Sequence, residues 1–361
     1  MDSSLFFGIS TVAYILAMVA YIAYLAFKNK GIGVTATGLT MIGFACQTAA
    51  LGLRWSEFYA IGKMGILRAV PLTNLYESLV FFIWCLILGY LIVEFKYKNR
   101  SFGAFITPVA GLALAFIDLS GMSKEIQPLV PALQSNWLLV HVMMSFLSYS
   151  TFAIAFATAM MYLILTADKR SSGAYIFWTV ALGLFAGVFL AMGLDFVAVG
   201  AGGSGAGVMG QSRIFRASFF NPSAAVQALS FVALAAFIFG VWRFGGSLKK
   251  VISSFSLSPS VLDEITYKCI AIGFPIFTLG GLIFGAIWAD QAWGVYWSWD
   301  PKETWSLITW FCYAFYLHAR LLRGWKEQKT AIVAVLGFTA VIFTYLGVNL
   351  LLSGLHAYGS Q

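Results

Sequence analysis

Three histidines are the residues of this chain whose type and placement could do chemistry, because each lies in or beside a long apolar segment. His141 lies in SNWLLVHVMMSFLSYS, His318 in WFCYAFYLHARLL and His356 in NLLLSGLHAYG. A lone histidine on a helix is most often a satisfied polar residue, but an ionisable group inside a membrane is costly and more often marks function. Neutral imidazole is a common ligand of metals and of haem iron. We therefore treat all three histidines as candidate haem-iron ligands.

Tryptophans are concentrated in the same part of the sequence as two of these histidines. Six of the twelve lie in or beside the stretch WGVYWSWDPKETW, namely Trp288, Trp293, Trp297, Trp299, Trp305 and Trp310. An aromatic belt at a membrane interface explains one or two tryptophans per helix end, but it explains several within one loop less well. Indole rings offer large apolar faces on which a flat macrocycle can stack. We expect a platform for haem formed by Trp293, Trp297, Trp299 and Trp305.

The acidic residues of this stretch have a structural interpretation. Asp300 is a good N-cap residue, Pro301 fits the first helical position, and Glu303 fits the third, so the motif predicts the start of a helix. Asn74 and Glu77 in PLTNLYES predict a second cap of the same kind. We therefore do not expect these acids to be catalytic.

Other polar residues accompany the candidate ligands. Three of them follow His141 at helical spacing and predict a polar helix face: Ser145, Ser148 and Tyr149. Three bases are predicted in the same outer layer as the tryptophans: Arg54, Arg68 and Lys302. These bases could pair with the propionates of haem, although solvated loop charge is the simpler account of each one.

Membrane helices must position these side chains, as the composition indicates. The chain is 60% hydrophobic and 10% charged, whereas a soluble domain is about half apolar and about a quarter charged. Apolar runs of about 20 residues recur and are long enough to span a membrane. Lipid admits only helices or closed barrels, and no alternating strand pattern is present. We predict an all-α polytopic membrane protein with ten helices, at residues 5–27, 33–53, 72–94, 102–118, 137–166, 174–198, 223–243, 265–289, 303–322 and 330–354.

The distribution of Lys and Arg predicts the orientation of these helices. Fourteen lie in the loops of one side and seven in those of the other. The positive-inside rule makes the first side cytoplasmic, so both termini and the Trp-rich loop are extracytoplasmic. His141 and His356 then lie at the outer surface. His318 follows Pro301 by about 26 Å of helix and lies near the cytoplasmic face. This assignment requires that residues 174–198 and 223–243 both span or that neither does.

The remaining composition narrows the classes of function. The net charge of +8 is explained by loop orientation and does not indicate a nucleic-acid partner. Four cysteines lie singly in apolar segments: Cys46, Cys85, Cys269 and Cys312. Without a C-x-x-C pair, a disulfide reductase or a thiolate metal site is disfavoured.

Several longer motifs carry a resemblance to a known family. WGVYWSWDPKETW resembles the tryptophan-rich WWD signature of the haem-handling membrane proteins of cytochrome c maturation. LDEITYKCIAIGFPIFTLG, PLTNLYESL and NLLLSGLHAYG are similar to the CcsA (ResC) branch of the system II cytochrome c synthases, for which the name CcsB is also in use. The similarity covers about residues 1–170 and 260–361. We expect five helices in 1–170, an insertion with two apolar segments and a cytoplasmic connector in 171–262, and the WWD-loop helices in 263–361.

The resemblance implies a function and a set of roles. The chain would be the haem-binding and haem-delivering subunit of a cytochrome c haem lyase. Haem b, as substrate and ligand, would be held reduced at the outer face by His141 and His356, the residues on which catalysis depends. Its vinyl groups would then be joined to the thiols of a C-x-x-C-H motif on an apocytochrome c. His318 matches a membrane-buried histidine that would bind haem at an inner site, opposite a histidine of the partner subunit.

The resemblance also implies partners and a location. The partners are a CcsB/ResB-type membrane subunit and a thioredoxin-like thiol reductant. The location is the bacterial cytoplasmic membrane or a thylakoid-type membrane.

Three other functions are compatible with parts of the sequence. The nearest is a haem exporter that passes haem to a carrier without forming a covalent bond; such relatives are typically shorter and lack the flanking motifs. A membrane electron carrier with b-type haems needs two pairs of histidines, which three histidines cannot supply. A solute transporter whose tryptophans form only a belt would bind no haem.

Overall fold

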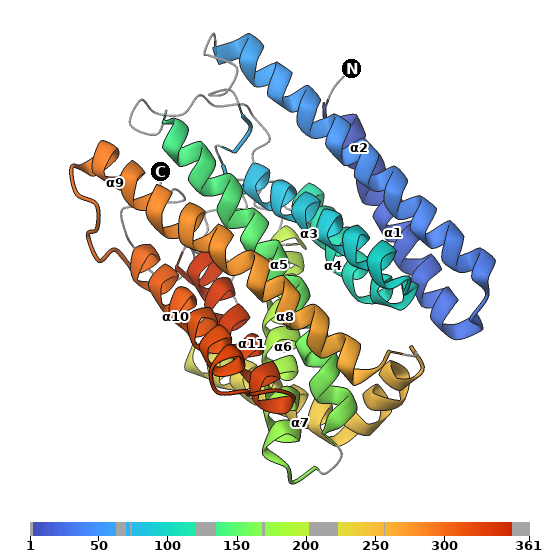
Figure 1. Cartoon of the computed structure of the whole chain (residues 1–361). Coiled ribbons are helices and arrows are strands. Elements are labelled where there is room, and N and C mark those ends of the chain that lie inside the picture. The colour runs from blue at the N-terminus through green and yellow to red at the C-terminus, as the bar shows by residue number, and fades with distance from the viewer. Residues whose placement is uncertain are drawn as a thin grey trace. The chain divides into compact units, whose positions relative to one another are not determined.

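The computed structural model describes residues 3–62, 70–72, 74–119, 135–167, 170–201, 223–255 and 257–348. All regular structure in these residues is helical (Figure 1). The elements in chain order are α1 (Ser3–Phe27), α2 (Lys30–Gly62), α3 (Leu75–Tyr97), η2 (Arg100–Phe102), α4 (Gly103–Leu119), α5 (Asn136–Thr166), α6 (Gly173–Ala201), α7 (Ala224–Ser253), α8 (Pro259–Ile276), η5 (Phe277–Phe284), α9 (Gly285–Trp293), α10 (Pro301–Leu321), α11 (Gln328–Ile342) and η6 (Phe343–Gly347). Of these, η2 is a 3₁₀ turn, and η5 and η6 are π-helical.

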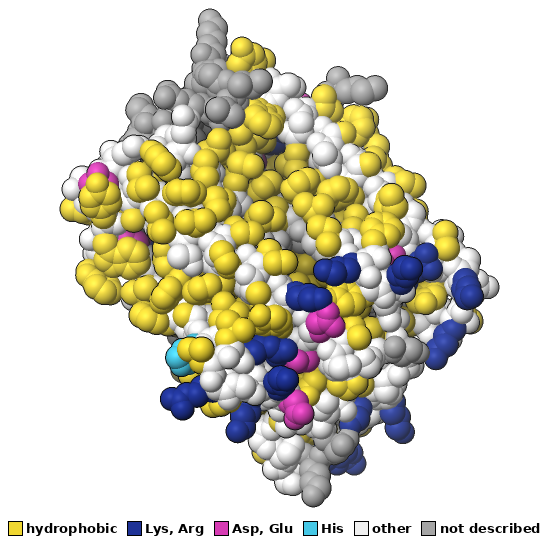
Figure 2. Space-filling view, viewed as in Figure 1, with side chains coloured by type: hydrophobic (Ala, Val, Ile, Leu, Met, Phe, Trp, Pro, Cys, Tyr) yellow, Lys and Arg dark blue, Asp and Glu magenta, His cyan; other side chains and the backbone are white. Residues whose placement is uncertain are grey.

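Nine helices within the described ranges are long and apolar enough to cross a membrane, α8, η5 and α9 counting as one. This confirms the prediction of an all-α polytopic membrane protein, and each of the ten predicted helices has a counterpart. The helix α10 is of similar length but is not among the nine. Hydrophobic side chains cover most of the face shown in Figure 2, as a lipid-facing surface requires, and Lys and Arg gather toward one end of it.

Several helix ends differ from the predicted ones. The helix α2 continues to Gly62 instead of ending at residue 53. The additional part of α2 includes Arg54, which pairs with Glu77, and Phe58, which is buried. The helix α7 continues to Ser253, so that much of the predicted connector 244–262 is helical. A helix that leaves the membrane can continue in water, because its backbone bonds are satisfied within the helix itself.

The predicted helix caps are confirmed at α3 and α10. The Asn74 side chain accepts a hydrogen bond of 2.9 Å from the Glu77 backbone N–H. The Asp300 side chain accepts one of 2.9 Å from the Lys302 backbone N–H. Each cap supplies an acceptor to one of the N–H groups that a helix start leaves unpaired.

The chain divides into two compact units, and the boundaries between them fall within α5, α8 and α10. The first unit comprises residues 1–119, 123–154 and 268–310, and the second comprises mainly residues 155–267 and 311–361. The predicted divisions at residues 170 and 262 do not coincide with these boundaries. In the first unit, α1 and α2 form an antiparallel pair that α4 contacts along α1 (Figure 1).

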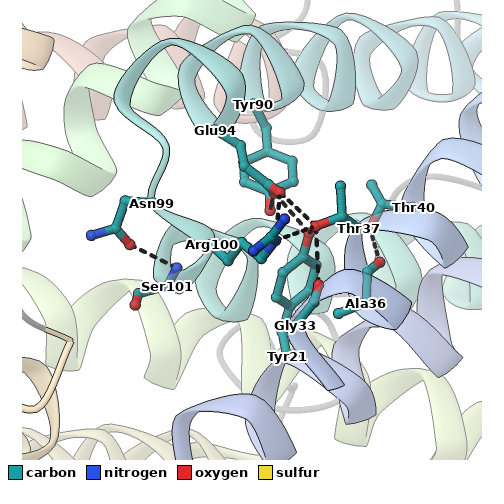
Figure 3. A network of polar contacts seen from close by, with 10 residues as sticks. All are labelled: Tyr21, Gly33, Ala36, Thr37, Thr40, Tyr90, Glu94, Asn99, Arg100 and Ser101. Atoms are coloured by element: carbon teal, nitrogen blue, oxygen red, sulfur yellow. Dashed lines mark hydrogen bonds and ion pairs between the residues drawn. The ribbon is translucent and has the colours of Figure 1, made fainter. Parts of the chain in front are cut away.

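A buried carboxylate links the helices of the first unit (Figure 3). Glu94 of α3 is 3% exposed and accepts hydrogen bonds from the hydroxyls of Tyr21 on α1 at 2.7 Å, Thr37 on α2 at 2.5 Å and Tyr90 on α3. Arg100 of η2 lies 3.7 Å from the same carboxylate and donates to the Thr37 hydroxyl. A buried charge is tolerated only when it is paired and hydrogen-bonded, and this network meets that requirement.

The second unit contains its own interhelical contacts. The Tyr175 hydroxyl of α6 donates to the Trp242 carbonyl of α7 at 2.9 Å. Both guanidinium N–H groups of Arg320 bind the Asp263 carboxylate at 2.7 Å, near the end of α10 and the start of α8. This bidentate pair fixes the end of α10, the helix that carries His318.

Candidate functional site

His141 lies on α5, and its orientation is set by a hydrogen bond to another helix. Its Nδ1 lies 2.8 Å from the carbonyl oxygen of Gly280 in η5. A carbonyl can only accept, so Nδ1 carries the hydrogen of the neutral ring. Nε2 is then the unprotonated nitrogen, and this nitrogen can ligate a metal. A histidine ligand normally donates its other N–H to such an oxygen, which fixes the tautomer and the ring orientation.

The approach of α5 to η5 and α9 depends on two glycines. A Cβ atom at Gly280 would lie 2.2 Å from the Cβ of Met144, and one at Gly285 would lie 2.8 Å from His141 Nδ1. Both distances are shorter than non-bonded atoms tolerate. The segment between these glycines is π-helical, and such segments are frequent at functional sites.

An indole ring of α9 lies beside the His141 imidazole, and further aromatic rings lie next to that indole or one turn away on α5. The Trp288 indole is 1% exposed and lies nearly parallel to the imidazole, with 15° between the planes and 6.4 Å between the centroids. Trp293 contacts Trp288 edge to face at 5.1 Å. Trp137, one turn before His141 on α5, contacts Phe284 at 5.4 Å. His141, Trp288 and Trp293 are therefore brought together by α5 and α9.

The predicted polar face of α5 is present in sequence but is buried in the structure. Ser145, Ser148 and Tyr149 are all buried. Ser148 donates to the backbone carbonyl of Ser145, and Tyr149 contacts Phe277 of η5 at 5.6 Å. This face therefore lies against η5 and serves helix packing.

The Trp-rich loop between α9 and α10 is short and held at both ends. Gly294 adopts a left-handed conformation and closes α9, so Trp293 is the last residue of that helix. The Glu303 carboxylate reaches back to the backbone N–H of Ser298 at 2.7 Å. Between these points Trp299 has a φ of 59° and is 68% exposed. The left-handed conformation is unfavourable for residues other than glycine. The loop must therefore hold the Trp299 backbone in it, with the indole exposed.

The four tryptophans of the expected platform occupy two kinds of position. Trp297 and Trp299 lie in the loop and meet edge to face at 5.8 Å. Trp293 is the last residue of α9, and Trp305 is the fifth residue of α10. The platform itself therefore stays a prediction, built from one loop pair and two helix-end rings.

The three bases considered as propionate partners differ in their surroundings. Arg54 is 3% exposed, and its guanidinium lies 2.9 Å from the Glu77 carboxylate and over the Tyr76 ring. The interpretation of Arg54 as a solvated loop charge is therefore wrong. Arg54 neutralises a buried acid that sequence alone could not pair with it. Lys302 lies just before the predicted span, where burial lowers its pKa to about 8 despite the nearby Asp300. Arg68 lies outside the described residues.

The other two candidate ligands are His318 and His356. His318 is exposed in the last part of α10 and belongs to the second unit. His356 lies outside the described residues. No group of three or more His, Cys, Asp and Glu side chains that could hold a bare metal ion occurs among the residues that the structure describes.

Sequence reasoning missed two residues of the His141 surroundings, Gly280 and Gly285, and it counted Trp288 among the clustered tryptophans without giving it a role. The two glycines stand in TLGGLIFGAIW, where the doubled glycine and a further glycine in one apolar helix signal close approach of another backbone. Which helix approaches could not be read from that signal.

The sequence was compared with protein families and with individual known proteins. Residues 72–356 match the model of a family described as cytochrome C assembly protein. Three relatives carry the name cytochrome c biogenesis protein CcsA. The relative from Synechocystis sp. is 37% identical over 358 residues, which are 96% of this chain and 94% of the relative. That from Trieres chinensis is 39% identical over 306 residues, 84% and 82% of the two chains, and that from Gloeobacter violaceus is 38% identical over 328 residues, 90% and 86%.

These alignments extend along almost the whole chain. Most of residues 171–255 therefore lie within the region aligned to the Synechocystis relative, while the three-part division of the chain stays a prediction.

Proposed function

Because the chain belongs to the cytochrome c assembly protein family, we propose that it is the haem-binding and haem-delivering membrane subunit of a system II cytochrome c synthase. Its role in cytochrome c biogenesis and its multi-pass membrane character follow from the family and from the nine apolar helices. The finer activity is the presentation of reduced haem at the outer face for thioether attachment. The observation that carries this proposal is the hydrogen bond from His141 Nδ1 to the Gly280 carbonyl, which makes Nε2 the unprotonated nitrogen of the ring.

The surroundings of His141 fit haem better than a bare metal ion. A porphyrin supplies four of the six ligands of its iron and leaves two axial positions, so one or two imidazoles suffice. The His141 imidazole lies beside the Trp288 indole, which in turn contacts Trp293, and Trp137 lies one turn away on the same helix against Phe284. Apolar walls of this kind suit a large flat ligand. We assign the second axial position to His356.

The residues of this chain would act by binding and orienting haem. Attachment adds each cysteine S–H across a vinyl group, so that an S–C bond forms and the hydrogen passes to the other vinyl carbon, with no net oxidation. His141 and His356 hold the iron until one of them is replaced by the histidine of the incoming C-x-x-C-H motif. Holding two thiols against two vinyl groups then supplies most of the rate enhancement through proximity.

His318 fits a second role, at a site shared with the partner subunit. Its side chain is exposed on α10, and Arg320 is bound to Asp263 two residues further along. An exposed imidazole near the end of α10 can meet a ligand that a CcsB/ResB-type subunit helps to hold. We assign the inner haem site to His318 on these grounds.

Covalent attachment distinguishes this function from haem export. The chain is produced with a ResB-type subunit and a C-x-x-C-H apocytochrome, and the haem that stays on the apocytochrome after denaturation is measured. We expect attachment with the wild-type chain, a loss of at least tenfold with His141→Ala, and no loss with Gly52→Ala, whose added Cβ meets no neighbouring atom. Haem that accumulates outside the membrane without becoming covalently attached would support an exporter and contradict the proposal.

A further inference from the structure

The imidazole of His141 on α5 is contacted by residues of η5 and α9. The Gly280 carbonyl accepts from Nδ1 at 2.8 Å. Gly285, at the start of α9, faces the same ring, because a Cβ added there would lie 2.8 Å from Nδ1 and 2.9 Å from Cε1. The imidazole is thus bounded by backbone on its Nδ1 edge.

A third contact limits rotation of the ring about its own axis. The Trp288 indole, one turn after Gly285, lies within 15° of parallel to the imidazole. It is 1% exposed and contacts Trp293 edge to face, so it cannot swing away without disturbing α9. The ring of His141 is therefore held by a hydrogen bond at one edge and by an indole beside it.

From these contacts, and on the basis of the function proposed above, we infer that Gly280, Gly285 and Trp288 are positioning residues that hold His141 in the Nδ1–H tautomer and direct Nε2 toward the haem iron. Gly285 has no side chain and so leaves space for the imidazole. Nδ1 can then come close enough to the Gly280 carbonyl to form the hydrogen bond. The role of the carbonyl is to fix the tautomer and to increase electron donation from Nε2.

The same geometry assigns Trp288 a different role from the other tryptophans. The plane of an axial imidazole contains the iron–nitrogen bond, so a macrocycle bound through Nε2 lies at right angles to the imidazole. Trp288 is nearly parallel to the imidazole and hence nearly perpendicular to that macrocycle. Trp288 therefore supports His141 and does not stack on the porphyrin, which leaves stacking to the platform residues Trp293, Trp297, Trp299 and Trp305.

Glycine substitutions test this inference. Gly285→Ala places a methyl group against the imidazole, and loss of an orienting partner of a metal-bound histidine typically weakens metal binding about 10- to 100-fold. Gly52→Ala in α2 is the control, because its added Cβ would meet no neighbouring atom. We expect haem titration of the purified complex to show weaker binding and an altered low-spin spectrum for Gly285→Ala, and wild-type behaviour for Gly52→Ala.

A double variant separates an effect on His141 from a general effect on helix packing. In His141→Ala supplemented with imidazole, the free ligand replaces the side chain, so adding Gly285→Ala should cost no further affinity. An equal loss in both backgrounds would overturn the positioning role. If His141→Ala binds haem as the wild type does, the ligand assignment fails instead, and with it the proposed function.

A measurement on the wild-type sequence does not depend on whether Gly285→Ala folds. Nitrogen NMR of the haem-free chain with isotope-labelled histidine distinguishes the two neutral tautomers, and His141→Ala identifies the signals of that ring. We expect a protonated Nδ1 and an unprotonated Nε2. The opposite tautomer, or rapid exchange between the two, would contradict the inference.

Discussion

Glu94→Gln is expected to destabilise the α1–α4 part of the first unit. The carboxylate is 3% exposed and accepts from three hydroxyls on three helices, those of Tyr21, Thr37 and Tyr90. An amide keeps only one oxygen and turns a donor toward hydroxyls that were themselves donating. The charge that strengthens these bonds is also lost.

The size of this effect can be bounded from both sides. Interhelical hydrogen bonds in membranes average about 0.6 kcal/mol, so the two from Tyr21 and Thr37 give about 1 kcal/mol. Hydrogen bonds to a charged group contribute at least about 1.5 kcal/mol each, so three give about 5 kcal/mol. Arg100 adds little to either figure, because its side chain is 38% exposed and water screens the pair. We expect a loss of about 1 to 5 kcal/mol.

Thermal unfolding in detergent, followed by circular dichroism, measures this loss. Glu57→Gln is the matched control: Glu57 accepts from the backbone N–H and the hydroxyl of Ser3 at the start of α1, and it is partly exposed. We expect the control to unfold within a few degrees of the wild type and Glu94→Gln to unfold clearly earlier. Equal melting of Glu94→Gln and the wild type would show that the buried network does not hold these helices together.

Three further predictions concern the haem sites. Haem affinity should fall as the pH rises through about 8, because the Lys302 ammonium can pair with a propionate only while it is protonated, and its pKa is lowered to about 8. The Lys302→Gln variant should not show this pH-dependent fall. A fall that persists in the variant would assign the titration to another group. His318→Ala should lower haem occupancy of the complex while the low-spin spectrum of the outer site is kept, and unchanged occupancy and cytochrome maturation would refute the inner-site role. A reporter fused after Gln361 should be extracytoplasmic, whereas a cytoplasmic signal would remove His356 from the outer site.

Much of the fold could be predicted because it depends on local properties of the sequence. The length and hydropathy of each segment were sufficient for ten helices, since lipid leaves the backbone few alternatives. The caps at Asn74 and Asp300 were also predictable, because a cap is decided within four residues. Helix ends were less accurate where charged residues near a membrane boundary, such as Arg54, were paired with a residue distant in sequence.

The site could be predicted only in part, because its contacts join residues that are distant in sequence. His141 and the tryptophans stand out by their type and surroundings in the sequence. The carbonyl that orients His141 belongs to Gly280, which is 139 residues away. A backbone carbonyl has no sequence signature, and the glycines that allow the approach indicate that some helix comes close without indicating which one.

The optical spectrum of the purified complex tests the central claim most directly. The chain is isolated with its ResB-type subunit, and oxidised and reduced spectra are recorded for the wild type and for His141→Ala/His356→Ala, before and after imidazole is added. We predict six-coordinate low-spin haem in the wild type, its loss in the double variant and its recovery with imidazole. A wild type without haem, or a double variant with an unchanged spectrum, would contradict the assignment of these histidines as the ligands of the outer haem.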